Sequence, residues 1–246
     1  MDPILILIVI LIIFIATFAK STIGFGDAVI AMPLLALVIS MRVATPLVAF
    51  MAMTTTIIIL LKNWHIVDVK ATWRLVLASC VGIPIGLFFL KSAPEVLMKT
   101  ILGLLIMFFG IYKFMQLQPP KLKDDKFGLT YFFGFIAGLT GGAYNTNGPP
   151  IVIYASLRRW APEKFRATLQ GYFLPTGFFI FMGHGLAGLW TTYVLSLYAF
   201  SLPAILLGIF IGGKLHKSIP QGRFDLYINL ALILIGALLI FRALIF

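Results

Sequence analysis

Residues 128–157 read GLTYFFGFIAGLTGGAYNTNGPPIVIYASL, two short apolar stretches separated by a polar break rich in glycine. As helices, the stretches 128–139 and 148–157 would each extend only about 15–18 Å, because an α-helix rises about 1.5 Å per residue. A helix that crosses a membrane needs about 20 residues. We therefore predict that this pair forms a re-entrant hairpin, which returns to the side it entered from and has its tip at membrane depth.

The composition places the whole chain in a membrane. Of its 246 residues, 61% are hydrophobic and 11% are charged, and the mean hydropathy is +1.06. An average soluble domain is about 45–50% apolar and about 25% charged. Soluble enzymes, disordered chains and secreted disulfide scaffolds are excluded, the last also because Cys80 is the only cysteine. The length leaves room for at most about ten membrane segments.

Ten apolar stretches are predicted to be helices, because lipid does not tolerate open sheet edges. The fold class is therefore an all-α polytopic membrane protein. The stretches are 3–19, 28–40, 43–61, 72–90, 96–115, 128–139, 148–157, 167–183, 192–213 and 224–246.

Charge gives the orientation. The net charge is +11, and fourteen of the 19 Lys and Arg residues lie in or beside the loops after the third, fifth, seventh and ninth stretches. Basic loops face the cytoplasm, so we predict a multi-pass membrane protein with both termini facing out, on the periplasmic or extracellular side. The first stretch is predicted to be retained, because no basic region precedes it and no small-residue cleavage site follows it. No basic run is interleaved with aromatic residues, so no nucleic-acid partner is expected.

The two halves of the sequence resemble each other. Gly82–Gly86 resembles Gly208–Gly212, and Lys91–Pro94 resembles Lys217–Pro220, both at an offset of 126 residues. At an offset of 117 residues, three residues of the first half align with residues of the second half, namely Phe18, Gly24 and Pro33 with Phe135, Gly141 and Pro150. An ordered series of matches predicts an internal repeat.

The charge-based orientation puts Lys91–Pro94 on the outer side and Lys217–Pro220 on the inner side, so the repeats are predicted to be inverted. We divide the chain into a first membrane repeat at 1–117, a cytoplasmic linker at 118–127 and a second repeat at 128–246. Each repeat would contain a broken-helix hairpin followed by about three transmembrane helices. Inverted repeats with interrupted helices are typical of secondary transporters, in which one half rocks against the other around a site near the midplane.

Each half opens with a polar break, at 20–27 and at 140–150. Uncovered backbone in a membrane is tolerated only inside protein or beside a water-filled cavity, and the N-terminus of a restarting helix favours an anion. The glycines have close helix packing as an alternative role, and the first pair either re-enters or spans fully. The predicted anion-binding residues in the two breaks are Lys20, Ser21, Thr22, Gly24, Gly26, Thr140, Gly141, Gly142, Asn145, Thr146, Asn147 and Gly148.

Two charged residues are predicted at membrane depth. Lys20 either extends to the interface or attracts the anion at the site. Asp27 either carries a coupling proton or pairs with Lys20, and intramembrane carboxylates are functional candidates by default. His184 is a second candidate for moving a proton, although a lone histidine is more often structural.

Polar residues outside the breaks have alternative roles. Arg166 either anchors its helix on the basic side or, with Gln170 one turn later, attracts anions to the site. The run of Thr54, Thr55 and Thr56 either bonds to its own helix, which we favour, or lines the ligand path. The sequence has no Cys, His and carboxylate set with metal-ligand spacing and no phosphate-binding loop, so no cofactor is expected. It also has no evident nucleophile with a neighbouring base, so no enzyme activity is expected.

The second break and the segment after it resemble a known family. Asn147-Gly148-Pro149-Pro150-Ile151-Val152-Ile153-Tyr154 and Phe165-Arg166-Ala167-Thr168, together with the repeat, resemble the TauE/SafE family of sulfite and organosulfonate exporters over nearly the whole chain. Gly24-Phe25-Gly26-Asp27 departs from the run of glycines usual in that family. The resemblance implies transport of a small sulfur anion, such as sulfite, thiosulfate or an organosulfonate, across the bacterial cytoplasmic membrane.

The predicted function is secondary transport of this anion by alternating access, coupled to protons or to the membrane potential. An anion-selective channel is the alternative, because it would use the same helix ends without a coupling group. An intramembrane enzyme would need an acid–base pair or a metal that the sequence does not offer. The expected partners are the anion and the lipid bilayer, and a homodimer is one assembly that the sequence allows.

Overall fold

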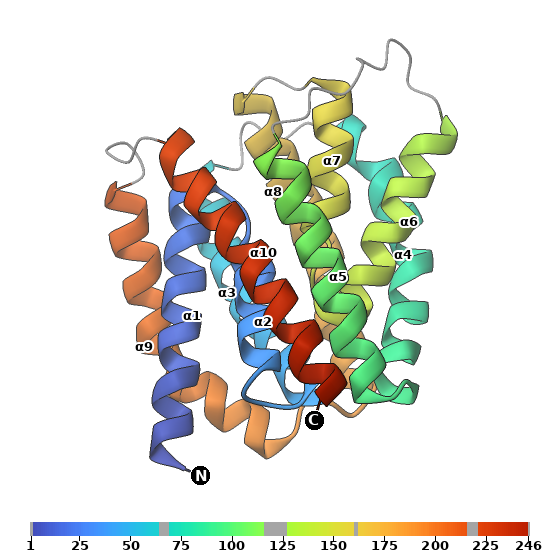
Figure 1. Cartoon of the computed structure of the whole chain (residues 1–246). Helices are drawn as coiled ribbons and strands as arrows, with labels where there is room; N and C mark the ends of the chain where they lie inside the picture. Colours follow the sequence, from blue (N-terminus) through green and yellow to red (C-terminus); the bar gives the residue numbers. More distant parts are fainter. Residues whose placement is uncertain (1, 64–68, 116–126, 160–161, 216–220, 246) are drawn as a thin grey trace.

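Ten helices make up the part of the chain that the computed structural model describes, which is residues 2–63, 69–115, 127–159, 162–215 and 221–245 (Figure 1). They are α1 (Pro3–Ile23), α2 (Asp27–Ala36), α3 (Met41–Asn63), α4 (Val69–Ser92), α5 (Glu95–Phe114), α6 (Phe127–Tyr144), α7 (Gly148–Arg158), α8 (Pro162–Leu186), α9 (Thr192–Leu215) and α10 (Gln221–Ile245). Each helix overlaps one predicted stretch, and the described residues contain no strand. The predicted all-α fold class is confirmed.

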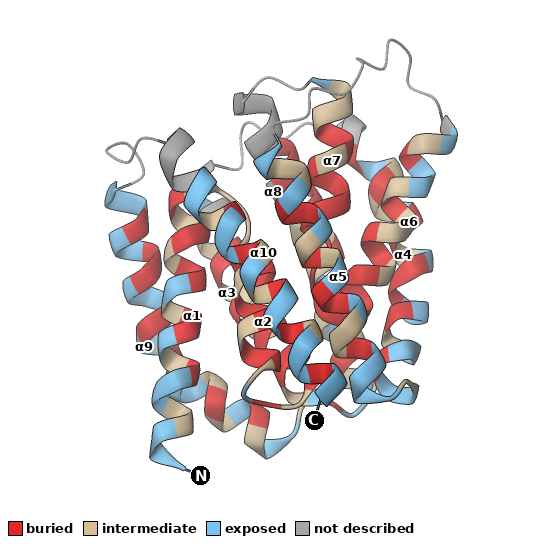
Figure 2. Cartoon of the chain, in the orientation of Figure 1, coloured by how far each residue is buried: buried red, intermediate tan, exposed pale blue. Residues whose placement is uncertain are grey.

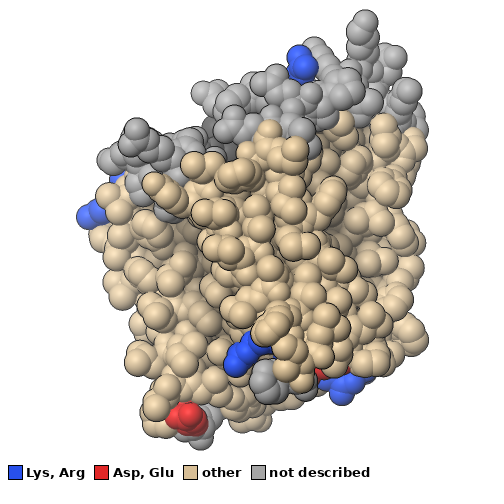
Figure 3. All heavy atoms as spheres, viewed as in Figure 1, with Lys and Arg blue, Asp and Glu red and all other residues tan. Residues whose placement is uncertain are grey.

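Six of the described helices, α1, α3, α4, α5, α9 and α10, are long and apolar enough to cross a membrane. Large apolar side chains such as Phe88, Phe108 and Phe241 are exposed on their outer faces, whereas buried residues face the interior (Figure 2). On the face drawn in Figure 3, the described charged side chains lie near the two ends of the molecule. An uncharged apolar band between charged ends is what a multi-pass membrane protein requires.

Both termini lie at the same end of the molecule (Figure 1). Helices α1, α5 and α9 run away from that end, and α4, α6 and α10 run toward it. The arrangement agrees with the prediction that the two termini share one side of the membrane. Which side they face stays a prediction.

Three helix pairs carry most of the packing, namely α4 with α6, α5 with α10, and α1 with α9. Glycine allows the close approach in each pair. Gly82 and Gly86 of α4 face the backbone of α6, and Gly208 and Gly212 of α9 face the backbone of α1. A Cβ added at Gly212 would lie only 2.7 Å from the carbonyl oxygen of Phe18. In a membrane, helix association depends on such close contacts, because lipid supplies no hydrophobic drive between helices.

The two breaks are shorter than predicted. Helix α1 continues through Ile23, and only Gly24–Gly26 separates it from α2, because Gly24 takes a left-handed conformation (φ 98°) and its N–H bonds to the carbonyl of Lys20 at 2.7 Å. Helix α6 continues through Tyr144 and ends there, because the next residue, Asn145, also has positive φ (53°). The second break is therefore Asn145–Asn147. The predicted boundaries 20–27 and 140–150 were too wide, because polar residues and glycines continue the helices where neighbouring helices cover them.

The helices after the breaks are short. Helix α2 has 10 residues and α7 has 11, so they rise about 15–17 Å, roughly half of the 30 Å hydrocarbon core. Helix α6 starts at the end of the molecule opposite the termini, and α7 returns to that end (Figure 1). The tip between them is buried, as expected of a re-entrant hairpin. Helix α1 is long enough to cross a membrane by itself, so the first pair differs from the second.

Candidate functional site

The two breaks, which are 121 residues apart in the sequence, line a single cavity. Its volume is about 30 Å³, and a cavity needs about 10–15 Å³ to hold one water, so the space suits a ligand of only a few heavy atoms. Helices α3 and α8 complete the wall. The lining residues are Lys20, Gly26, Asp27, Ala28, Val29, Ala49, Ala52, Met53, Thr56, Asn145, Asn147, Gly148, Phe173 and Gly177.

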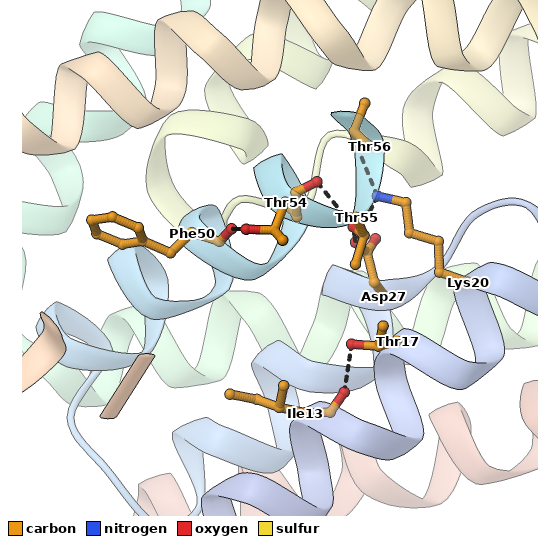
Figure 4. A network of polar contacts seen from close by, with 9 residues as sticks. Ile13, Thr17, Lys20, Asp27, Phe50, Thr54, Thr55 and Thr56 are labelled. Atoms are coloured by element: carbon orange, nitrogen blue, oxygen red, sulfur yellow. Dashed lines mark hydrogen bonds and ion pairs between the residues drawn. The ribbon is translucent and has the colours of Figure 1, made fainter. Parts of the chain in front are cut away.

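A buried ion pair lies in the cavity wall. The ammonium Nζ of Lys20 is 2.7 Å from Oδ2 of Asp27 and donates a second hydrogen bond to the hydroxyl of Thr56 at 2.9 Å (Figure 4). The hydroxyl of Thr55 lies 3.2 Å from the same carboxylate oxygen. Lys20 is 2% exposed and Asp27 is 7% exposed. Lys20 therefore does not extend to the interface, and Asp27 pairs with it, which was one of its two predicted roles.

Two helix N-termini also meet at the cavity. Gly26 precedes α2 with a left-handed conformation (φ 103°), Asn147 precedes α7, and neither helix start has a side-chain cap. Such helix starts present free backbone N–H groups and the positive end of the helix dipole. Pro149 and Pro150 follow at the start of α7 and remove two of its N–H donors. Helix α2 therefore offers more backbone donors than α7, which instead adds the asparagine side chains.

The arrangement can hold a small anion. Beside the Asp27 carboxylate, it combines one ammonium, one hydroxyl, two carboxamides and two positive helix ends, all in a buried site. These groups are donors for several oxygens at once. The cavity is lined by residues of both halves of the chain.

Comparison with known proteins is consistent with this chemistry. Residues 9–239 match the sequence profile of the sulfite exporter TauE/SafE family. The chain belongs to this family. No curated protein and no solved structure gave a significant match. Membership in TauE/SafE identifies a multi-pass membrane protein from a family of sulfur-anion exporters, so the resemblance seen in the sequence is confirmed.

In this TauE/SafE protein, the predicted asparagines lie where the sequence placed them. Asn145 and Asn147 are both buried and line the cavity. The Nδ2 of Asn147 donates to the hydroxyl of Thr176 at 3.2 Å, and that hydroxyl donates to the carbonyl of Tyr172 at 2.6 Å. The phenol of Tyr172 in turn lies 2.7 Å from the hydroxyl of Ser79 on α4. A hydrogen bond thus joins the tip of the second hairpin to α8, and another joins α8 to α4.

Seven other predicted ligands lie near the breaks but do not line the cavity of the TauE/SafE chain. Thr22, Thr140 and Thr146 bond to backbone carbonyls of Phe18, Ile136 and Tyr144. Gly24 ends α1, Gly141 packs on Ile180, and Gly142 packs on the backbone of α4. The hydroxyl of Ser21 is buried without a hydrogen-bond partner. For Gly141 and Gly142, close helix packing is the role that the structure shows.

Two further candidates lie on α8. The side chains of Arg166 and Gln170 lie outside the described residues. His184 is fully buried, with Nε2 3.4 Å from the carbonyl of Gly142 and Nδ1 without a hydrogen-bond partner. It does not line the cavity, so nothing in its position connects it to the ion pair.

Thr55 and Thr56 were not among the predicted site residues, because the sequence favoured bonds within their own helix over the alternative that the threonine run lines the ligand path. The predicted bonds to their own helix occur for Thr54, which donates to Phe50, and for Thr55, which donates to Ala52. However, Thr55 and Thr56 also contact the ion pair. The one available signal was that a buried lysine and a buried aspartate need polar partners from some neighbouring helix.

Proposed function

We propose that this chain is a secondary transporter that moves a small sulfur-containing anion, such as sulfite, thiosulfate or an organosulfonate, across the cytoplasmic membrane. The observation that carries the proposal is the single buried cavity where Lys20, Asn145, Asn147 and the starts of α2 and α7 converge. Family membership supports the substrate class. Sulfite and sulfonate groups present three oxygens on one sulfur, and they require several converging donors.

Alternating access is the proposed mechanism, and the arrangement of the two halves supports it. Helices that correspond in the predicted repeats run in opposite directions, as α1 and α6, α4 and α9, and α5 and α10 do (Figure 1). The glycines aligned at an offset of 126 residues also make corresponding contacts, because each pair faces the first helix of the other half. These features fit inverted repeats at 1–117 and 128–246 with the site between them.

Energy for transport must come from a gradient, because the sequence has no ATP-binding motif. Protons and the membrane potential are the proposed sources. Asp27 is the coupling candidate that touches the site. His184 would be coupled only through a rearrangement that brings it to the cavity.

Flux in proteoliposomes tests this function. Purified protein should transport at least one of sulfite, thiosulfate, sulfate, taurine and sulfoacetate, with a rate that saturates at low substrate and increases when the same anion is present on the opposite side. An anion channel would conduct without saturation at low concentration and without this exchange. Turnover of a substrate in detergent, without any membrane, would show an enzyme and contradict the proposal.

The asparagines of the second hairpin provide a local test. Asn145→Ala and Asn147→Ala should each weaken anion binding about tenfold or more, because each removes a donor worth about 1.5–3 kcal/mol when it contacts a charged group. Binding can be measured calorimetrically in nanodiscs. Ser156→Ala is the matched control, since the Ser156 hydroxyl bonds to the Val152 carbonyl within α7 and does not line the cavity. Wild-type affinity in both asparagine variants would contradict the proposed site.

A further inference from the structure

The described wall of the cavity contains two charged residues, one positive and one negative. Lys20 and Asp27 neutralise each other at 2.7 Å. An anion that bound beside the intact pair would bring a second negative charge close to Asp27 in a buried site. Like charges repel strongly in such a site. The cavity therefore suits an anion poorly while Asp27 is ionised and paired.

Lys20 is the shared partner in this competition. Its ammonium has three N–H donors, and two of them are directed at Asp27 and Thr56. An anion that takes its main charge interaction from Lys20 must replace the carboxylate in that role. The carboxylate then needs a way to remain buried without its cation.

The Thr55 hydroxyl supplies a hydrogen-bond partner for the buried Asp27 side chain. Its hydroxyl lies 3.2 Å from Oδ2 of Asp27 and 2.9 Å from the carbonyl of Ala52. The one hydroxyl hydrogen has two acceptors within reach. When Asp27 is ionised, Thr55 can donate to it. When Asp27 is protonated, Thr55 can donate to Ala52 and accept the carboxyl hydrogen, so both protonation states of Asp27 have a hydrogen-bond partner.

We propose that Asp27 is a counter-ion which the anion displaces from Lys20, so that the anion and one proton bind together. A hydronium ion in solution transfers its proton to the Asp27 carboxylate and leaves water, the Lys20–Asp27 ion pair separates, and Lys20 donates to the anion instead. No other covalent bond changes, and the Thr55 hydroxyl donates to the carbonyl of Ala52 instead of to Asp27. This proposal rests on the proposed function, since it assumes that the cavity is the anion site.

Few other groups can compete for this proton. Facing the pair, α3 contributes Thr55 and Thr56, the second hairpin contributes Asn145 and Asn147, and the part of α8 that lines the cavity contributes Phe173 and Gly177. On the far side of Gly26, a neighbouring cavity between α2, α5 and α10 is lined by Lys113 and Asn229. Lys113 is a cation and attracts anions from that side. The described lining of both cavities contains no second carboxylate and no histidine.

Linkage gives the sign of the pH effect. Because the anion binds the form with protonated Asp27, its dissociation constant should rise with pH, by up to about tenfold per pH unit where Asp27 is ionised in the free protein. Thiosulfate is the probe of choice, because its own charge is constant between pH 5 and pH 8, whereas sulfite gains a proton in that range. Titration of the protein with thiosulfate in weakly buffered solution should also take up about one proton for each anion bound.

Variants distinguish the proposed anion site from the proposed counter-ion role of Asp27. Asp27→Asn should bind thiosulfate with a dissociation constant that no longer depends on pH and that is at least tenfold lower than the wild-type value at pH 8. Thr54→Val should keep the wild-type dependence, because the Thr54 hydroxyl contacts Phe50 and Tyr198 and does not line the cavity. Lys20→Gln should lose thiosulfate binding at every pH.

Each outcome decides one point. Unaltered binding in Lys20→Gln would contradict the proposed site itself. Loss of binding in Lys20→Gln, combined with a wild-type pH dependence in Asp27→Asn, would overturn only the counter-ion role. If Asp27→Asn does not fold, proton uptake by the wild-type protein decides alone, and binding without proton uptake overturns the proposal.

Discussion

Lys20→Met should destabilise the protein by about 3–5 kcal/mol, the range for breaking a buried ion pair by removal of one partner. The change leaves the Asp27 carboxylate buried, with the Thr55 hydroxyl at 3.2 Å among its remaining partners. Adding Asp27→Leu should restore most of the lost stability, because replacing both members of such a pair by apolar residues is often neutral or stabilising. The double variant should nevertheless transport no anion, since the cation of the site is gone.

Unfolding in mixed detergent micelles, followed by circular dichroism, measures the stabilities, and proteoliposome flux measures transport. Lys99→Met is the control, because Lys99 pairs with Glu95 at 3.0 Å on a partly exposed helix surface. Exposed pairs of this type contribute only about 0.3–0.5 kcal/mol. A double variant that transports at the wild-type rate would remove Lys20 from the mechanism. A single variant as stable as the wild type would show that Asp27 is not ionised in the folded protein.

Gly142→Ala should destabilise the protein by about 3 kcal/mol or more, at or above the usual upper end for overpacking. The added Cβ would overlap the carbonyl oxygen of Ile83 and lie 3.0 Å from the backbone nitrogen of Leu87. Both atoms belong to the backbone of α4, so α4 and α6 would have to separate. The loss should greatly exceed the gain of about 0.5–1 kcal/mol that alanine gives in a helix.

Gly128→Ala is the matched control for this change, because it lies on the same helix and its added Cβ would meet no atom within 4 Å. It should leave stability unchanged or raise it slightly. Thermal unfolding of the two variants in the same detergent makes the comparison. If Gly142→Ala instead keeps wild-type stability and loses anion affinity, Gly142 is a ligand, as the sequence alone predicted, and the α4–α6 contact is not the reason for the glycine.

The ten helices and the identity of the two breaks were predictable, because lipid demands long apolar helices and because polar, glycine-rich stretches are rare in such a chain. The sequence matched four glycines of the first half and the second half with each other, but it did not predict that they would serve in close helix contacts. Gly82, Gly86, Gly208 and Gly212 do face neighbouring backbones. Sequence alone did not give their partners, since a glycine pattern does not say which helix it faces.

The extent of the breaks and the threonine contacts were not predictable. Whether a helix ends at Lys20 or at Ile23 depends on the left-handed conformation of Gly24 and on what covers the last turn. The bond from Lys20 to Thr56 joins residues 36 positions apart, and no local pattern specifies it. The local cue, a threonine run, predicted bonds within the helix, and these form for Thr54 and Thr55 but are only part of what the run does.

The glycine contacts described above also bear on which parts of the molecule move as units. The pairs α4 with α6 and α1 with α9, like the pair α5 with α10, each join a helix of one half to a helix of the other. Two halves joined by such close helix contacts cannot move apart as separate rigid bodies. We therefore expect the mobile bodies to be composites, one built around α1 and α9 and the other around α4 and α6, which stand on opposite sides of the molecule (Figure 1). Each composite would carry one of the two hairpin tips, so a relative slide of the bodies would open and close the anion cavity between them.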